Sequence, residues 1–376
     1  MQNERDETQA GEETATVKGA IGFPCTQCGN QMTFDPARGK LYCDYCKSEK
    51  EIDSAETEAA EYLYFPKDEH FEAPQWENEP GQRLVCPSCG AETVMGAAAM
   101  TATCPFCSSH YVTAAPTGNT VISPETMIPF RISEASARQS FTDWVKKQWL
   151  APRCFKKEAK RPEMRGVYIP YWTFDAALTT EYHGFGGVRR VEHYTVRVNG
   201  KTQTRTRTRT DWYPVGGDMH MDFDNIPCPA TKKVDRALLD KLGGYSLKIL
   251  NVYNPAYLAG FYAERYSIGL SEGFDMVRQT MERRMTAHIE STLGYDTYRG
   301  MQYRHHYEEV KFKHILLPLW LAAYTFRGKV YQFMVNGETG RAAGKAPLSA
   351  AKIALLVAGG ILAAAALLFA LFCLGE

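Results

Sequence analysis

The sequence lacks several features that would assign it to a familiar class. Residues 1–20, MQNERDETQAGEETATVKGA, contain no apolar run of the kind that a secretory signal peptide needs. There is no P-loop either, because Gly200-Lys201-Thr202 has Thr195 where the motif requires its first glycine. Cys154 and Cys228 lie in no recognisable Cys-protease pattern. We therefore expect neither an exported protein nor a helicase by itself, and no enzyme of a known nucleophilic type.

The 22 residues from Ile353 to Leu374 carry no charge, and this run ends two residues before the C-terminus. As a helix this run reaches about 33 Å, enough to cross a hydrocarbon core of about 30 Å. Arg341, Lys345 and Lys352 precede it, which favours a plasma (inner) membrane protein with its N-terminal bulk in the cytoplasm. The run predicts a single-pass tail anchor at 353–374, the alternative being a buried core helix. Small residues spaced four apart would also permit self-association through it.

Acidic and basic residues are unevenly distributed, although the formal net charge is zero. Residues 1–82 hold 18 acidic and 7 basic side chains, so the front of the chain is acidic and the rest is basic. We expect residues 1–20 to form a disordered acidic tail. Residues 51–80 hold ten acidic side chains and one Lys, which favours a flexible acidic linker whose scattered aromatics either stay solvated or dock on a neighbour.

Eight of the eleven cysteines follow one spacing that occurs twice. In each copy two Cys-x-x-Cys pairs are separated by 14 residues, a pattern typical of a zinc ribbon. We predict zinc ribbons at 21–50 and 81–115, each holding one structural Zn²⁺. Gly29 and Gly90 follow the first pairs, where a knuckle turn often needs positive φ. The predicted ligands are Cys25, Cys28, Cys43, Cys46, Cys86, Cys89, Cys104 and Cys107.

The spacing leaves three other uses of these cysteines open. Iron of the rubredoxin type uses similar knuckles, a reducing cytosol disfavours disulfides, and a redox Cys-x-x-Cys pair usually opens a helix in a βαβ unit. Four thiolates would complete the coordination of each zinc ion, so we expect these sites to support folding rather than catalysis.

Residues 120–344 have the composition of an ordinary mixed α+β domain. Ser133 can cap a helix that runs to about residue 150, with Phe141, Trp144, Val145 and Trp149 on one apolar face. Further helices are predicted at 235–242 and at 271–293, the latter ended by Gly294. Residues 308–324 predict a strand broken at Pro318. Basic residues between 153 and 165 either attract anionic lipids or cover a solvated loop.

A hairpin is predicted around Asn199-Gly200, which favours a two-residue type I′ turn. This turn pairs Tyr194 with Arg205 and Glu192 with Arg207, in a projecting ribbon with no apolar face. Segment 189–210 has seven basic and one acidic residue. It is the best candidate for binding lipid headgroups, nucleic acid or an acidic protein. The candidate anion-binding residues are Arg197, Lys201, Arg205, Arg207 and Arg209. Alternatively, the stripe of arginines pairs inside the sheet with Asp218, Asp222 and Asp224.

Three motifs resemble a known family. They are Val167-Tyr-Ile-Pro-Tyr-Trp-Thr-Phe-Asp-Ala176, Leu316-Leu-Pro-Leu-Trp-Leu321 and Val335-Asn-Gly-Glu-Thr-Gly340, which follow the cysteine quartets. Together they resemble the bacterial membrane proteins with transcription factor IIB-type zinc ribbons, which are sometimes labelled primosomal helicases. The resemblance covers about residues 22–344 plus the anchor. It implies membrane localisation and zinc on the eight cysteines, and no established activity.

These observations favour a multidomain α+β protein that acts as a cytoplasm-facing membrane adaptor, in which the ribbons and the linker recruit a protein partner. Nucleic-acid binding by the ribbons is the first alternative. It is disfavoured because only Arg38 and Lys40 lie on the first ribbon hairpin, the second has no Lys or Arg between Cys89 and Cys104, and each thiolate-held zinc adds about −2. An enzyme with an unrecognised site in the α+β domain is the second alternative.

Overall fold

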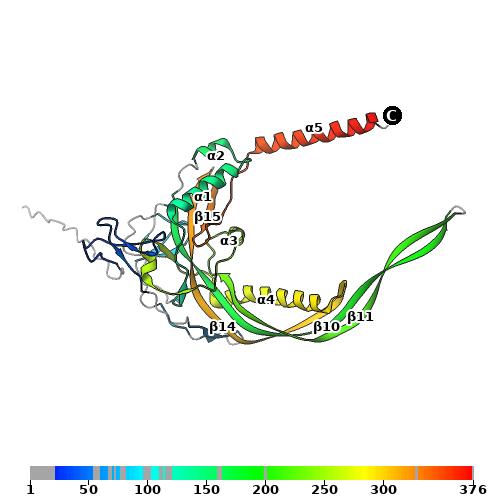
Figure 1. The fold of residues 1–376 in the computed structure, drawn as a ribbon, viewed down its shortest axis with the longest axis horizontal. Helices are drawn as coiled ribbons and strands as arrows, with labels where there is room; N and C mark the ends of the chain where they lie inside the picture. Colours follow the sequence, from blue (N-terminus) through cyan, green and yellow to red (C-terminus); the bar gives the residue numbers. More distant parts are fainter. Residues whose placement is uncertain are drawn as a thin grey trace, which may run out of the picture.

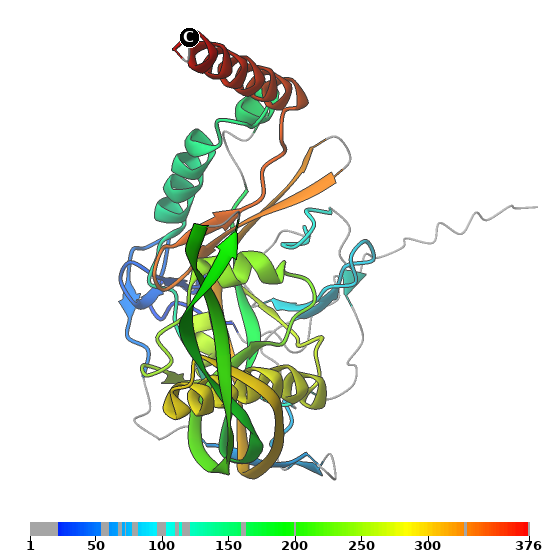
Figure 2. The ribbon, with the colours of Figure 1, turned by 90° about the vertical axis from the view of Figure 1, so that its right-hand side faces the viewer.

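The structure is a computed structural model that describes residues 22–53, 60–66, 70–71, 73–76, 82–95, 103–109, 113–114, 121–158, 163–198, 201–326 and 329–374. The acidic tail expected at 1–20 lies outside these residues. The described chain is a mixed α+β protein with a 13-stranded sheet, a separate 3-stranded sheet and helices packed on the large sheet (Figures 1 and 2).

The elements have the following bounds. The small sheet contains β1 (Thr33–Asp35), β2 (Lys40–Tyr42) and β3 (Glu49–Lys50). The large sheet contains β4 (Tyr62–Phe65), β5 (His70–Phe71), β6 (Gln82–Val85), β7 (Glu92–Met95), β8 (Thr113–Ala114), β9 (Thr126–Met127), β10 (Arg165–Val198), β11 (Lys201–Pro229), β12 (Asn251–Val252), β13 (Tyr262–Glu264), β14 (Thr297–Phe326), β15 (Lys329–Asn336) and β16 (Ala342–Gly344). The helices are α1 (Glu134–Lys147), α2 (Arg153–Glu158), α3 (Arg236–Leu242), the 3₁₀ helix η1 (Pro255–Leu258), α4 (Leu270–Leu293) and α5 (Ala350–Leu374).

Three long antiparallel strands form the frame of the molecule, with β10 between β11 and β14. They curve together away from the body (Figure 1). The prediction that a strand breaks at Pro318 is wrong, since Pro318 lies opposite Tyr168 within an uninterrupted β14. β14 also begins at Thr297, eleven residues before the expected start.

The apolar run of β14 is explained by burial on both faces of the sheet. Leu316 and Trp320 belong to one core cluster, whereas Leu317, Leu319 and Leu321 belong to another. Successive side chains of a strand point to opposite faces, so this alternation places a hydrophobic core on each side. The sequence of this part of β14 is therefore continuously hydrophobic and does not alternate between apolar and polar residues.

Helix α4 covers one face of the long strands. Its Phe274, Val277, Met281, Met285 and Ile289 are buried, as the spacing predicted. They form one cluster with side chains of β10 and β14. Gly294 ends the helix at φ 68°, which confirms the predicted stop.

Helix α1 has the predicted N-cap, and the helix expected at 235–242 is α3, which is capped by Asp235. The Ser133 hydroxyl accepts a hydrogen bond from the backbone N–H of Ser136, and the Asp235 carboxylate accepts one from Leu238. Phe141 lies in the core, but α1 ends at Lys147, and Trp149 beyond it is 60% exposed. The expectation that Trp149 continues the apolar face is therefore wrong.

Two elements project from the body on the same side (Figure 1). The last strand pair between β10 and β14 joins Gly187 to Thr297, so only β10 and β11 continue outward. We call residues 188–198 of β10 and 201–211 of β11 the arm. The second projection is α5, the one helix in the described part of the chain that is long and apolar enough to cross a membrane. None of its candidate span, Ala350–Leu367, is buried against the body.

Part of the segment expected to be a flexible linker is ordered. β4 pairs with β14, with Leu63 opposite Lys311. Tyr64 and Trp76 are buried, and Glu61 Oε1 lies 2.8 Å from the buried Lys313 Nζ. The linker interpretation is therefore wrong for these residues, because their aromatic side chains bury apolar surface in the core and a buried ammonium needs their carboxylate.

Candidate metal centres

The eight predicted ligands lie in four similar turns. In each turn, a backbone N–H four residues after the first cysteine donates to the carbonyl of that cysteine, at 2.7–3.0 Å. Positive φ is found at the donor of each turn, at Gly29, Lys47, Gly90 and Ser108. The expectation for the two glycines is confirmed. This geometry points both thiols of a Cys-x-x-Cys pair to the same side of the turn.

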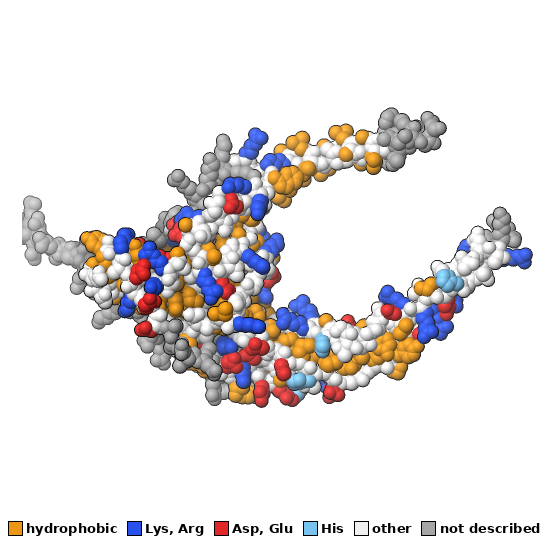
Figure 3. Space-filling model, in the orientation of Figure 1, with side chains coloured by type: hydrophobic (Ala, Val, Ile, Leu, Met, Phe, Trp, Pro, Cys, Tyr) orange, Lys and Arg blue, Asp and Glu red, His pale blue; other side chains and the backbone are white. Residues whose placement is uncertain are grey.

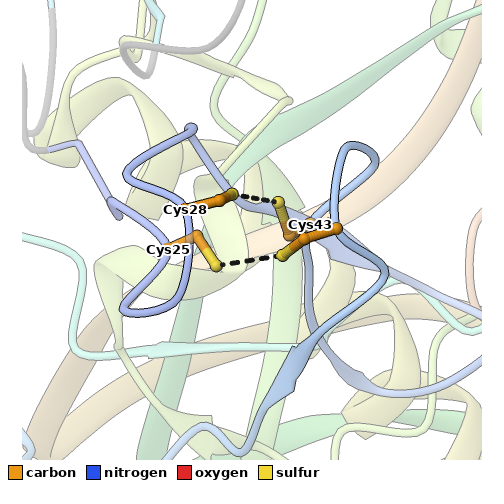
Figure 4. Close-up of side chains that lie close together, drawn as sticks. Cys25, Cys28 and Cys43 are labelled. Atoms are coloured by element: carbon orange, nitrogen blue, oxygen red, sulfur yellow. Dashed lines mark hydrogen bonds between the residues drawn. The ribbon is translucent and has the colours of Figure 1, made fainter.

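The turns bring the cysteines together in two groups of four. In the first group, Cys25 Sγ lies 3.5 Å from Cys46 Sγ, and Cys28 Sγ lies 3.5 Å from Cys43 Sγ (Figure 4). The corresponding distances in the second group are 3.7 Å for Cys86–Cys107 and 3.6 Å for Cys89–Cys104. Within each group all four sulfur atoms lie within 4.8 Å of one another.

These distances fit a tetrahedral ion. Four sulfurs at about 2.3 Å from a central Zn²⁺ would be about 3.8 Å apart, close to the distances observed. Both groups can therefore bind a metal ion, and the all-thiolate donor set is consistent with zinc. Hydrogen bonding alone does not account for four mutually close thiols, since each is a weak donor.

Ser48 supports the first group, a role that the spacing of the cysteines did not predict. Its Oγ lies 3.0 Å from Cys25 Sγ and 3.1 Å from Cys46 Sγ. The hydrogen bond from Ser48 lowers the pKa of Cys25 to about 6 and also lowers the pKa of Cys46. A lowered pKa favours the thiolate, which is the form that binds metal.

In the second group, the neighbouring thiols of Cys89 and Cys104 compete for a proton. The hydrogen bond from Cys104 lowers the pKa of Cys89 to about 5, and the same contact raises the pKa of Cys104. Lys233 lies nearby, with its Nζ donating to the Cys89 carbonyl at 2.6 Å. Because Lys233 is 144 residues away in sequence, no local signal could have found it.

The first cysteine module, residues 22–53, is docked on the body. The backbone N–H of Phe34 donates to the Ala259 carbonyl at 2.9 Å. The Phe34 ring packs edge-on against Tyr257 at 5.1 Å, and Asn254 Nδ2 donates to the Asp53 carbonyl. Phe34 and Cys43 belong to the core cluster that includes Trp320.

The second cysteine module, residues 82–95 and 103–109, is part of the large sheet. β7 pairs with β13, and β6 pairs with both β7 and β8. Gln332 Nε2 of β15 donates to the Phe106 carbonyl at 3.2 Å. Cys86 and Cys104 share a core cluster with Leu317. A flexible linker at 51–80 would let the modules reach outward, whereas the structure packs each module against the body.

The predicted hairpin register is confirmed, with Tyr194 opposite Arg205 and Glu192 opposite Arg207. The Asn199-Gly200 turn and the Lys201 side chain lie outside the described residues. Arg205, Arg207 and Arg209 share one face, because they alternate along β11. Arg197 pairs with Thr202 and lies on the opposite face, so the five candidates do not form one surface.

The arginines do not pair with the predicted acids. Arg207 Nε lies 2.8 Å from Glu192 Oε2, and Arg209 lies 2.9 Å from an Asp211 oxygen. Asp218 is opposite Glu181, nearer the body, so pairing of the stripe with Asp218, Asp222 and Asp224 is wrong. The register decides this, because those acids follow the arginines along the same strand. Figure 3 shows basic side chains along the outer arm and acidic ones nearer the body.

The chain is similar to a known protein, the uncharacterised protein YdjG of Bacillus subtilis (strain 168). The two are 30% identical over 340 residues that cover 90% of this chain and 94% of the relative. No family model and no solved structure matches the chain. The similarity therefore shows the family and carries no activity.

Proposed function

We propose that this chain, which belongs to the family of Bacillus subtilis YdjG, is a single-pass membrane adaptor whose bulk faces the cytoplasm and recruits a protein partner. The observation that carries the proposal is α5. This 25-residue helix leaves the body and exposes large apolar side chains, including Leu355 and Leu362. Such a surface is unfavourable in water and suits a hydrocarbon core. The basic Arg341 and Lys345 before it, and Lys352 in its first turn, support the cytoplasmic orientation.

The eight cysteines would hold two structural zinc ions in zinc ribbons. When bound, each ion crosslinks two distant turns and leaves no open coordination position for catalysis. The modules then brace the body: the first packs on η1, and the second extends the large sheet. In this proposal the metals stabilise the scaffold, and recruitment depends on another surface.

We assign recruitment to the arm. Its two strands have no helix or third strand over them among the described residues, and both outer edges offer backbone hydrogen-bonding groups. A two-stranded ribbon of this kind is only marginally stable in water, and an exposed edge readily accepts another strand. One face carries Arg190, Arg205, Arg207 and Arg209 against two acids, Glu192 and Asp211. An extended acidic segment of a partner protein would match both the edge and the charge.

Nucleic-acid binding by the same face is the alternative that the arginines favour. Arg205 has no ion-pair partner in the described part of the chain, and Arg207 and Arg209 are more than half exposed. Phosphates could compete for them with Glu192. Such binding would weaken steeply with salt, since it releases counterions.

Crosslinking and pulldown from membranes would test the adaptor proposal. The first variant replaces residues 190–209 by Asn-Gly, which closes the hairpin at the observed pair of Arg189 with Thr210. The second is Cys86→Ser with Cys89→Ser. Loss of the crosslinked partners with the shortened arm, in a protein that still floats with membranes, is the expected result. Unchanged partners with the shortened arm would overturn the assignment to the arm.

The two faces of the arm provide a matched charge test. Arg205→Gln, Arg207→Gln and Arg209→Gln change one face, and Thr204→Ala, Thr206→Ala and Thr208→Ala change the other at neighbouring positions. We expect only the arginine variant to lose the protein partner. A salt-dependent gel shift that the arginine variant abolishes would instead support the nucleic-acid alternative.

A further inference from the structure

Near the first turn of α5 the body exposes aromatic, aliphatic and basic side chains. Trp149 and Leu348 are 60% and 63% exposed. Lys147, Arg153 and Lys329 are also exposed, and Lys352 lies in the first turn of α5. We call this set the collar: Lys147, Trp149, Arg153, Lys329, Leu348 and Lys352.

Lys352 fixes the collar to α5. Its Nζ donates to the carbonyl of Trp149 at 2.6 Å and to the carbonyl of Ala151 at 2.8 Å. The backbone N–H of Ser349 donates to the Leu150 carbonyl at 3.0 Å. The loop between α1 and α2 is therefore held level with the start of the apolar helix, and the two cannot move apart without losing three hydrogen bonds.

Trp149 differs from the other five tryptophans. Trp76, Trp172 and Trp320 are buried, and Trp144 and Trp212 are partly buried. An exposed indole costs free energy in water, while its amphipathic ring suits the headgroup region of a bilayer. The exposed basic side chains of the collar suit anionic headgroups, because such side chains can lay their aliphatic stems over apolar surface.

The collar is also hollowed next to the helix. A groove of about 400 Å³ is lined by Pro152, Phe326, Lys329, Tyr331, Pro347 and Leu348. Its lining is about equally polar and apolar and includes Lys329, a combination that suits the headgroup region of an anionic phospholipid. The groove is continuous with the first residues of α5, so it would open at the surface of the bilayer that α5 crosses.

We propose that the collar seats the body on the headgroup layer of an anionic bilayer, with Trp149 and Leu348 inserted at the interface. The proposal rests on α5 being a membrane anchor and deepens it. It assigns α5 and the collar together to the bilayer.

Depth-dependent quenching of tryptophan fluorescence tests this in the full chain. The protein is reconstituted in vesicles of phosphatidylcholine and phosphatidylglycerol that carry a spin label either near the headgroup or deep in the acyl chains. Flotation comes first, because a protein that does not float with the vesicles would refute the anchor itself. For a protein that floats, the emission lost with Trp149→Phe is the Trp149 signal.

We expect the shallow label to quench this Trp149 signal at least about twofold more strongly than the deep label, since an interfacial indole lies at headgroup depth. Trp212→Phe, one residue beyond the arm on β11, is the matched control and should leave the quenching unchanged. Leu348→Trp in the Trp149→Phe background gives a second reporter within the collar. Absence of shallow quenching at both positions in a protein that floats would overturn the collar and leave the anchor standing.

Discussion

Lowering the pH should destabilise the body through His314, which is buried at the centre of the large sheet. Its Nδ1 lies 2.9 Å from the Ile122 carbonyl, which can only accept, so Nδ1 carries the proton. Nε2 has no hydrogen-bond partner in the part of the chain that the structure describes. The ring packs against Trp172 at 5.0 Å and Tyr266 at 5.6 Å. A second proton would create a cation with nothing to accept its new hydrogen bond.

Burial therefore lowers the pKa of His314 to about 4, and the hydrogen bonds to Ile122 and Ser123 oppose this only in part. The unfolded chain has an ordinary histidine pKa of about 6.5. Since the folded pKa is the lower one, the unfolded state takes up the proton first as the pH falls. The stabilisation is present above about pH 6.5 and is lost progressively towards pH 4.

At about pH 5 this difference amounts to about 2 kcal/mol of unfolding free energy relative to about pH 7.5. For a body of this size it corresponds to a drop of about 3 °C in the melting midpoint. Thermal melts followed by tryptophan fluorescence, on the full chain in mild detergent, measure it. Other groups titrate in the same range, including the cysteine thiols, so the comparison with a variant is needed.

His314→Asn removes the titration while its amide can still donate to the Ile122 carbonyl. We expect the variant to start from a lower midpoint and to lose about 2 kcal/mol less than the wild type between the two pH values. His288→Asn removes an exposed imidazole of α4 and is the matched control, with a pH dependence like that of the wild type. An equal loss of midpoint in His314→Asn and the wild type would refute the reasoning.

Three further outcomes are expected. Metal analysis should give about two zinc ions per chain and about one in Cys104→Ser, because a three-thiolate site binds zinc less tightly; two in the variant would contradict the assignment of ligands. Met281→Ala should cost about 2–5 kcal/mol in denaturant melts, since the side chain is fully buried under α4, and the exposed Arg283→Ala should cost little. Glu61→Gln should cost about 1–3 kcal/mol because the buried Lys313 loses its carboxylate, and Lys313→Met in the same chain should recover part of that loss. If Lys313→Met restored none of the stability lost in Glu61→Gln, Glu61 would not act as the counter-charge of Lys313.

Several features were predictable from the sequence because neighbouring residues determine them. The spacing of the cysteines predicts four knuckle turns, and the positive φ of Gly29 and Gly90 follows from the turn itself. An Asn-Gly pair predicts the hairpin register out to the pair of Tyr194 with Arg205. The caps Ser133 and Asp235 act within one helical turn. The apolar, uncharged run of α5 likewise needs no partner to be recognised.

Tertiary structure decided which distant segments meet. The acidic composition of residues 51–80 favoured a tether, whereas β4 is ordered by its pairing with β14 and by the need of Lys313 for a counter-charge. Strand pairing leaves no signal in either strand alone, so the docking of the cysteine modules on η1 and β13 could not be predicted. The same holds for Lys233 beside Cys89, and for Trp149, whose place beside α5 depends on hydrogen bonds from Lys352. The sequence by itself thus determined the local turns, caps and apolar helix, since their energetics are local, and only folding determined which surfaces remained exposed.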